Sequence, residues 1–239
     1  MAKFMENENN DLLSMKPITN AIGLASSNAV QGTSKFLGYI CLPAAEELGL
    51  YLKDKVQGWR QENAIKTLEK ARELLNHKKL SLPINVHPKI ACNIVEHSSW
   101  SNDELLQNLW AGLLVSSCTS TENSDSNAIY IDILSKLTYS QAKLIEYICP
   151  LAQPKKTPGG WVIAEELEID PDDLIKISGI PDRHQLDAEL DFLSSIDLIQ
   201  GGFYPESYLA KIIVRPLCLQ LYARCQGYAG SIDDYYNCK

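Results

Sequence analysis

The sequence lacks the features of secreted, membrane-spanning and disulfide-bonded proteins. Its seven cysteines are an odd number and contain no Cys-x-x-Cys pair, which argues against a disulfide framework and a four-cysteine zinc site. Near the N-terminus, Glu6, Glu8 and Asp11 interrupt the apolar core that a signal peptide would need. The uncharged stretch 17–34 is rich in Ser, Thr, Asn and Gln, so it does not read as a transmembrane span. We therefore expect a cytoplasmic protein.

The sequence also lacks the short motifs of common enzyme classes. It has no GxSxG, no GxxxxGK[ST], no HExxH and no GxGxxG after a strand. The nearest approach to a metal site is the group of His87, Cys92, Glu96 and His97. On a helix only Cys92 and Glu96 of this group share a face, so we interpret it as a capped helix with a buried thiol. We expect no catalytic residues, no cofactor and no metal ion.

What the sequence does contain is an ordinary globular composition with an uneven charge. Of 239 residues, 45% are apolar and 22% charged, and the formal net charge is −8. Residues 1–120 contain 12 Lys/Arg and 12 Asp/Glu, whereas residues 121–239 contain 10 and 18, so the second half carries the whole charge excess. Because nucleic acids and anionic membranes attract positive charge, this balance argues against either as the main partner.

Apolar spacing in the first half predicts a helical domain after a polar arm. Residues 1–34 are small and polar, and we expect a loosely ordered arm there. Within a helical domain over residues 35–120, the spacing predicts a long helix from about Ala44 to Leu75. The capping box Ser101-Asn-Asp-Glu104 predicts the start of another helix, whose wide apolar face must be buried on both flanks.

The second half predicts a winged-helix-like domain over residues 128–228 and a C-terminal tail over 229–239. The polar loop 119–127 marks the boundary before it. The expected elements are a helix capped by Thr138-x-x-Gln141, a strand at Trp161–Ile163, helices from Asp170 and Pro181, strands at Leu198–Gln200 and Lys211–Val214, and a helix from Pro216. The expected fold class is therefore mainly α, with a helical N-terminal region followed by a winged-helix-like α+β module with a small two-stranded wing.

Acidic residues decide how we interpret this second domain. The helix that would enter a DNA groove, Pro181–Ile196, carries four acidic residues against only Arg183, and the wing adds only Lys211 and Arg215. We therefore expect it to contact protein, with a nucleic-acid-binding regulator as the alternative. A second acidic group, which we interpret as a solvated helix start, comprises Glu165, Glu166, Glu168, Asp170, Asp172 and Asp173.

Two features of the first half leave further partners open. Residues 51–80 contain eight Lys/Arg and four Asp/Glu, a local charge of +4 that would suit an anionic ligand, although a solvated helix face is favoured. The apolar run Phe36–Leu52 would suit a membrane-acting effector, but Pro43 and two glutamates interrupt it. A buried amphipathic helix is the favoured interpretation.

The sequence contains the strings Pro43-Ala-Ala-Glu-Glu-Leu-Gly49, Asp54, Trp59-Arg60 with Asn63, Leu68-Glu-Lys-Ala71, Glu104-Leu-Leu-Gln-Asn-Leu-Trp-Ala-Gly-Leu-Leu114, the stretch Ile129–Ile148, Leu193-Ser-Ser-Ile-Asp-Leu-Ile199 and Ile213–Cys225. Together these strings resemble the bacterial abortive-infection alpha (Abi-alpha) family. The resemblance covers about residues 36–226, and the Trp-Ala-x-Leu-Leu segment is its most specific part.

This resemblance implies defence against bacteriophage by halting or killing the infected host, without implying an enzyme. We expect the protein to act through a protein partner or self-association. The candidate interaction residues are Trp59, Arg60, Asn63, Lys66 and Trp110. The competing interpretation is structural, with Trp110 in the core and Trp59 covering the same core from the long helix.

Overall fold

The computed structural model describes residues 36–41, 58–78, 85–119 and 126–238. It is mainly helical with two small antiparallel sheets, which confirms the expected fold class. The chain divides into two compact units, Met1–Ile131 (unit 1) and Asp132–Lys239 (unit 2), and each is described by itself. The arm predicted over residues 1–34 lies outside the described residues.

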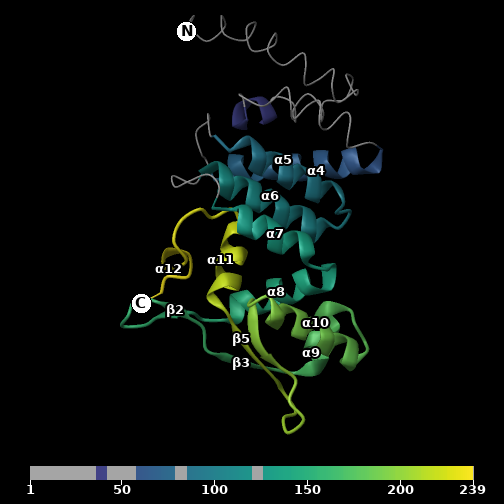
Figure 1. Ribbon diagram of the computed structural model, residues 1–239, viewed down its shortest axis with the longest axis vertical. Helices are drawn as coiled ribbons and strands as arrows, with labels where there is room; N and C mark the ends of the chain where they lie inside the picture. Colours follow the sequence, from purple (N-terminus) through teal and green to yellow (C-terminus); the bar gives the residue numbers. More distant parts are fainter. Residues whose placement is uncertain (1–35, 42–57, 79–84, 120–125, 239) are drawn as a thin grey trace, which may run out of the picture. The chain divides into compact units, whose positions relative to one another are not determined.

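Unit 1 is built on three helices that pack against one another: α4 (Trp59–His77), α5 (Pro88–Ser99) and α6 (Glu104–Thr119) (Figure 1). Gly58, before α4, has a φ of 59°, in the left-handed region that an α-helix cannot use. The long helix predicted from Ala44 is therefore interrupted at this glycine, and its part before Gly58 lies outside the described residues.

Helix α6 is the centre of unit 1. All residues from Leu109 to Cys118 are buried, as its wide apolar face predicted. It begins at Glu104, so Ser101 is not its N-cap, and the predicted capping box is wrong. Instead, the Ser101 carbonyl accepts a hydrogen bond from Gln107 Nε2 at 3.0 Å.

The short helical segment 36–40 adds to the same core. Phe36, Leu37 and Ile40 are buried, and the Val86 amide donates to the Ile40 carbonyl at 2.9 Å. The apolar side chains considered for membrane contact are, in this described part, packed inside unit 1. The remainder of the run Phe36–Leu52 lies outside the described residues.

Unit 2 follows the order of elements that its sequence predicts, with additions. Its elements are α8 (Tyr139–Leu151), β1 (Lys155–Lys156), β2 (Val162–Ile163), β3 (Glu166–Ile169), α9 (Pro171–Ser178), α10 (Arg183–Ser195), β4 (Ile199–Gly202), β5 (Ala210–Val214), α11 (Pro216–Cys225) and α12 (Ile232–Tyr235). Helix α7 (Ala128–Lys136) spans the division between the units. Strands pair as β1-β2 and as β3-β5-β4, an arrangement consistent with a winged helix.

Local signals explain where the helices of unit 2 begin. Thr138 caps α8 through both bonds of a capping box with Gln141, which confirms that prediction. Asp170 caps α9, Pro171 takes its first position, and Gly179 ends it with a φ of 77°. The Asp170 side chain accepts a hydrogen bond from an amide that the helix start leaves unpaired, and Pro171 has no amide hydrogen to leave unpaired. Glycine favours the left-handed conformation in which many helices end.

Strand β3 corrects the interpretation of the acidic group at residues 165–173. Glu166 and Glu168 lie on a strand, not at a helix start, and alternate on the face where Lys211 of β5 contacts both at 3.6 and 3.4 Å. Only Asp170, Asp172 and Asp173 belong to the start of α9. Glu166 and Glu168 therefore stabilise the sheet by pairing with a charge on the neighbouring strand, and they do not interact with a helix dipole.

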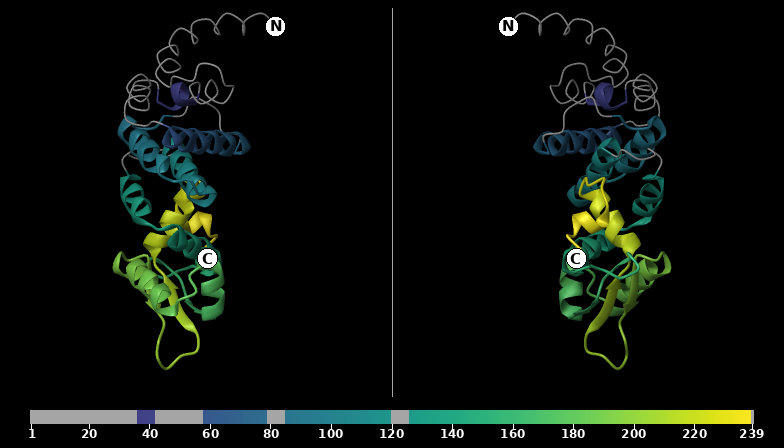
Figure 2. Two further views of the ribbon diagram at one scale, coloured as in Figure 1. Left: turned by 90° about the vertical axis from the view of Figure 1, so that its right-hand side faces the viewer. Right: turned by 90° about the vertical axis from the view of Figure 1, so that its left-hand side faces the viewer.

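The β4–β5 hairpin is the two-stranded element that the sequence predicted as a wing, and its loop extends away from the other elements of unit 2 (Figure 2). Gly201 has a φ of 95°, and a Cβ there would lie 2.2 Å from the Lys211 carbonyl oxygen. No other residue type fits this close approach of the two strands. Residues 229–238 also fold, because α12 contacts α11 and Cys238 Sγ donates to the Pro154 carbonyl at 3.4 Å.

Candidate functional site

The structure brings together two of the five candidate residues on the surface of unit 1. Trp59 and Arg60 open α4, and both approach Trp100, which follows α5. The ring centroids of Trp59 and Trp100 lie 5.9 Å apart at an interplanar angle of 68°, an edge-to-face contact. Both indoles stay more than half exposed, at 55% and 57%. We call Trp59, Arg60 and Trp100 the Trp59–Trp100 patch.

The Arg60 guanidinium is held in place by one aromatic ring and three hydrogen bonds. Its central carbon lies 3.7 Å from the centroid of the Trp100 ring, a cation–π contact. Its Nε and Nη2 atoms donate to Ser99 Oγ at 3.1 and 2.9 Å, and Nη2 also donates to Glu96 Oε1 at 3.2 Å. The Arg60 side chain is only 16% exposed, so this ion pair is better shielded from solvent than a surface pair.

Asn63 and Trp110 lie beneath this surface and do not form part of it. Asn63 is buried and donates from Nδ2 to the Ser99 carbonyl at 3.2 Å, which ties α4 to the end of α5. Trp110 is 2% exposed and stacks on His97 with centroids 5.8 Å apart. Lys66 is exposed and lies outside the group. The structural interpretation thus describes Trp110, which is buried, whereas Trp59 is 55% exposed and contacts the ring of Trp100.

Trp100 is the member of the patch that sequence reasoning missed. Its signal was a large aromatic residue within the polar string Ser98-Ser-Trp-Ser-Asn-Asp103, where no apolar spacing calls for one. A tryptophan without a place in an amphipathic pattern is a candidate for surface recognition. Its contact with Arg60 joins residues 40 positions apart, and that pairing is visible only in three dimensions.

Several of the basic side chains considered for anionic partners are paired within the part of the chain that the structure describes. On α4, Lys70 pairs with Glu104 at 3.3 Å and donates to Asn108 Oδ1 at 2.8 Å. In unit 2, Arg183 of α10 pairs with Asp172 at 3.0 Å. The two basic residues of the wing region are also paired, Lys211 with β3 and Arg215 with Asp197.

The cysteine thiols of the structure are free, and five of the seven are buried. Burial raises the pKa of Cys41 to about 11 and of Cys118 to about 12. Burial likewise raises the pKa of Cys149 and Cys225, so these thiols stay protonated at neutral pH and are poor nucleophiles.

Of the structural roles predicted for the histidine group, the helix cap is confirmed, but Cys92 is only partly buried and is not the expected buried thiol. His87 caps α5 by accepting from the Lys89 amide at 3.3 Å, and Glu96 pairs with Arg60. Within the described ranges, His, Cys, Asp and Glu form no group of three that would hold a metal ion. Nor does any helix in those ranges have the length and apolar character to cross a bilayer.

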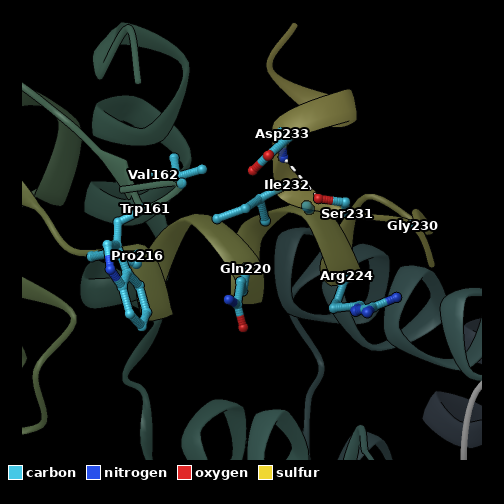
Figure 3. Close-up of a pocket in the computed structure, with 11 residues that line it drawn as sticks. Trp161, Val162, Pro216, Gln220, Arg224, Gly230, Ser231, Ile232 and Asp233 are labelled. Carbon is cyan, nitrogen blue, oxygen red and sulfur yellow. Dashed lines mark hydrogen bonds between the residues drawn. The ribbon is translucent and has the colours of Figure 1, made fainter. Parts of the chain in front are cut away.

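Unit 2 has a cavity of about 340 Å³ between the β1–β2 hairpin, α11 and α12 (Figure 3). Its polar groups are mostly used inside the fold. Arg224 Nη1 donates to the Tyr228 carbonyl at 3.3 Å, and Asp233 pairs with Lys156. Ser231 Oγ accepts from the Asp233 amide at 3.2 Å and caps α12. We interpret this cavity as the seam that holds the C-terminal helix.

The described residues form a mainly helical protein with two small antiparallel sheets and an exposed aromatic patch that holds a guanidinium. The family model of abortive infection alpha matches residues 60–214, more than half of the chain, and the protein belongs to this family. Comparison with curated proteins and with solved structures returned no match.

Proposed function

We propose that this protein acts in abortive-infection defence against bacteriophage by associating with a protein, and that it does so without catalysis. Membership of the abortive infection alpha family supports the defence role. The protein target is a separate part of the proposal, and the Trp59–Trp100 patch is the observation that carries it. We place the protein in the cytoplasm because its seven cysteines are all free, as in a reducing compartment.

The chemistry of the patch favours protein recognition. Trp and Arg are the residue types most enriched where alanine substitution weakens protein complexes most. Ser99 and Glu96 fix Arg60 before any partner arrives, so binding costs little side-chain entropy. The two exposed indoles offer apolar area beside a charge that is already paired. Such a surface fits an apolar patch on a protein better than a phosphate, which would compete with Glu96 for Arg60.

The defence role is tested by plating phages on cells that carry the intact gene and on cells that carry an empty vector. We expect at least one phage of a broad panel to form fewer plaques on the first strain. Early death or growth arrest of infected cells, measured at high multiplicity, is expected to accompany this reduction. Equal plaque counts across the whole panel would overturn the defence role.

The association is tested by affinity capture from infected and uninfected cells with three forms of the protein. We expect wild type to retain a partner, or a second copy of itself, that Trp59→Ala/Trp100→Ala loses. Trp161→Ala is the matched control, because it removes a tryptophan that is 76% exposed in unit 2. Identical captured proteins for wild type and the patch variant would contradict the role of the patch.

A further inference from the structure

A second cavity of unit 2, of about 350 Å³, opens between the start of α10 and the loop that joins β4 to β5. Its walls combine aromatic and charged side chains, among them Phe203, Tyr204 and Tyr208 from the loop and Arg183, His184 and Asp187 from α10. In a DNA-binding winged helix, the corresponding helix and wing are the parts that approach the duplex. Here the same two elements line a small site that holds aromatic rings, one carboxylate and the basic side chains of Arg183 and His184.

Asp187 is the feature that points to a ligand. Its carboxylate has no hydrogen-bond or ion-pair partner among the residues that the structure describes. It is half-buried, and its Oδ1 atom lies 4.0 Å from the position that a Cβ would take on Gly202. Arg183, the cation nearest in sequence, is turned to Asp172 instead. A carboxylate that loses part of its hydration without a partner favours the arrival of a positive charge.

The aromatic side chains around Asp187 suit the same positive charge. Tyr208 is 96% exposed and Tyr204 46%, although both carry large rings. Ser207 orders their loop, since its amide donates to the Tyr204 carbonyl at 3.0 Å and its hydroxyl to the Leu209 carbonyl at 2.7 Å. Ring faces attract cations, most strongly the guanidinium of arginine, with an energy of about 0.5–1 kcal/mol at exposed sites.

We propose that this cavity binds the arginine or lysine side chain of a partner protein, with Asp187 as its counter-ion and the tyrosines as its aromatic walls. Charge complementarity supports this choice of occupant: residues 121–239 carry all of the −8, and Asp182, Asp191 and Glu206 flank the cavity in sequence. The same charge repels a nucleic-acid backbone. The inference rests on the proposed protein association and names the chemistry of one contact that it uses.

The test is a set of NMR titrations of the full chain with capped nine-residue Gly/Ser peptides that differ only at the central residue. A single side chain binds weakly, so we expect a dissociation constant on the order of 1 mM for the arginine peptide. The arginine peptide should shift the protein's NMR signals at the β4–β5 loop, and the lysine peptide should shift them less. The glutamine and glutamate peptides should leave these signals unchanged.

Three variants separate the site from general electrostatics. Asp187→Asn should weaken the binding of the arginine peptide by about tenfold, because the bound cation loses a close charge partner. Asp191→Asn, which removes the same charge from an exposed position of α10, should change the affinity by less than about twofold because distant surface charges are screened. Tyr208→Ala, at a side chain too exposed to affect folding, should weaken it by about threefold.

Equal shifts with the glutamine peptide, or equal effects of Asp187→Asn and Asp191→Asn, would overturn the inference. Shifts of the same loop signals by a short DNA duplex would overturn it in favour of a nucleic-acid surface. These results leave the proposed function untouched, because phage protection and the Trp59–Trp100 patch are measured separately. Conversely, if the protein binds the arginine peptide but gives no protection against phages, the proposed function would be wrong and the proposed binding site would stand.

Discussion

The two units combine aromatic rings and charge in opposite ways. In unit 1 the chain supplies the cation itself, and Arg60 is bonded to Ser99 and Glu96 while it stacks on Trp100. In unit 2 the aromatic loop lies beside Asp187, a carboxylate with no partner in the described part of the chain. The first surface is electrostatically complete, and the second, as we propose, is completed by a partner. Binding at the first should therefore depend little on salt, and binding at the second should weaken as salt rises.

The largest effect on the free energy of unfolding is expected from a buried tryptophan of unit 1, in contrast to an exposed tryptophan of unit 2. Trp110→Ala removes a side chain that is 2% exposed at the centre of unit 1 and should cost about 3–5 kcal/mol of unfolding free energy. Trp161→Ala removes one that is 76% exposed in unit 2 and should change it by less than about 0.5 kcal/mol. Urea denaturation followed by circular dichroism measures both, and equal losses would contradict the assignment of Trp110 to the core.

A smaller effect is expected at the one capping box that the structure confirms. Thr138→Ala removes the hydroxyl that accepts from the Gln141 amide at 3.2 Å, and should cost about 1 kcal/mol. Thr138→Ser keeps the hydroxyl and is the matched control. Thermal melts of the two variants should differ, and Ser101→Ala, where the predicted box is not formed, should melt as wild type does. A Ser101 effect as large as that of Thr138 would contradict the observed start of α6.

The smallest effect that we expect is a pH-dependent change in stability that comes from Glu146 in unit 2. Burial raises the pKa of Glu146 above its ordinary value, and a hydrogen bond from Gln226 at 2.7 Å opposes this only in part. Because the folded state prefers the protonated carboxyl, its stability falls as pH rises through the unfolded pKa and then through the raised folded pKa. Glu146→Gln keeps the acceptor for Gln226 and removes the charge. The variant should gain stability over wild type at pH 8 and not at pH 4.

Urea midpoints at the two pH values check this prediction. A variant that is less stable than wild type at pH 8 would show that the Glu146 charge is favourable in the fold, contrary to the effect of burial. Glu206→Gln, which removes a carboxylate at an exposed position of the loop that joins β4 to β5, is the control for the loss of a charge alone. Its midpoint should show no comparable dependence on pH.

The sequence was sufficient at several positions where local chemistry decides the structure, although not at Ser101, where the predicted capping box is not formed. The sequence correctly predicted the start of α8 from the capping box at Thr138 and the start of α11 from Pro216. It also predicted the burial of α6 from its wide apolar face. It was insufficient where a distant partner decides. The acidic string Glu166–Ile169 forms a strand because β5 supplies its hydrogen bonds and Lys211 its counter-charge. The patch of unit 1 depends in the same way on Trp100, which is 40 residues from Arg60 in the chain.

The most direct test of this account is the efficiency of plating of a phage that the wild-type protein restricts, measured at matched protein levels. The strains carry wild type, Trp59→Ala/Trp100→Ala or Trp161→Ala, and circular dichroism of the purified proteins verifies that each is folded. We predict that the patch variant loses protection and that the Trp161 variant, which removes the more exposed indole, keeps it. Full protection by the folded patch variant would contradict the account.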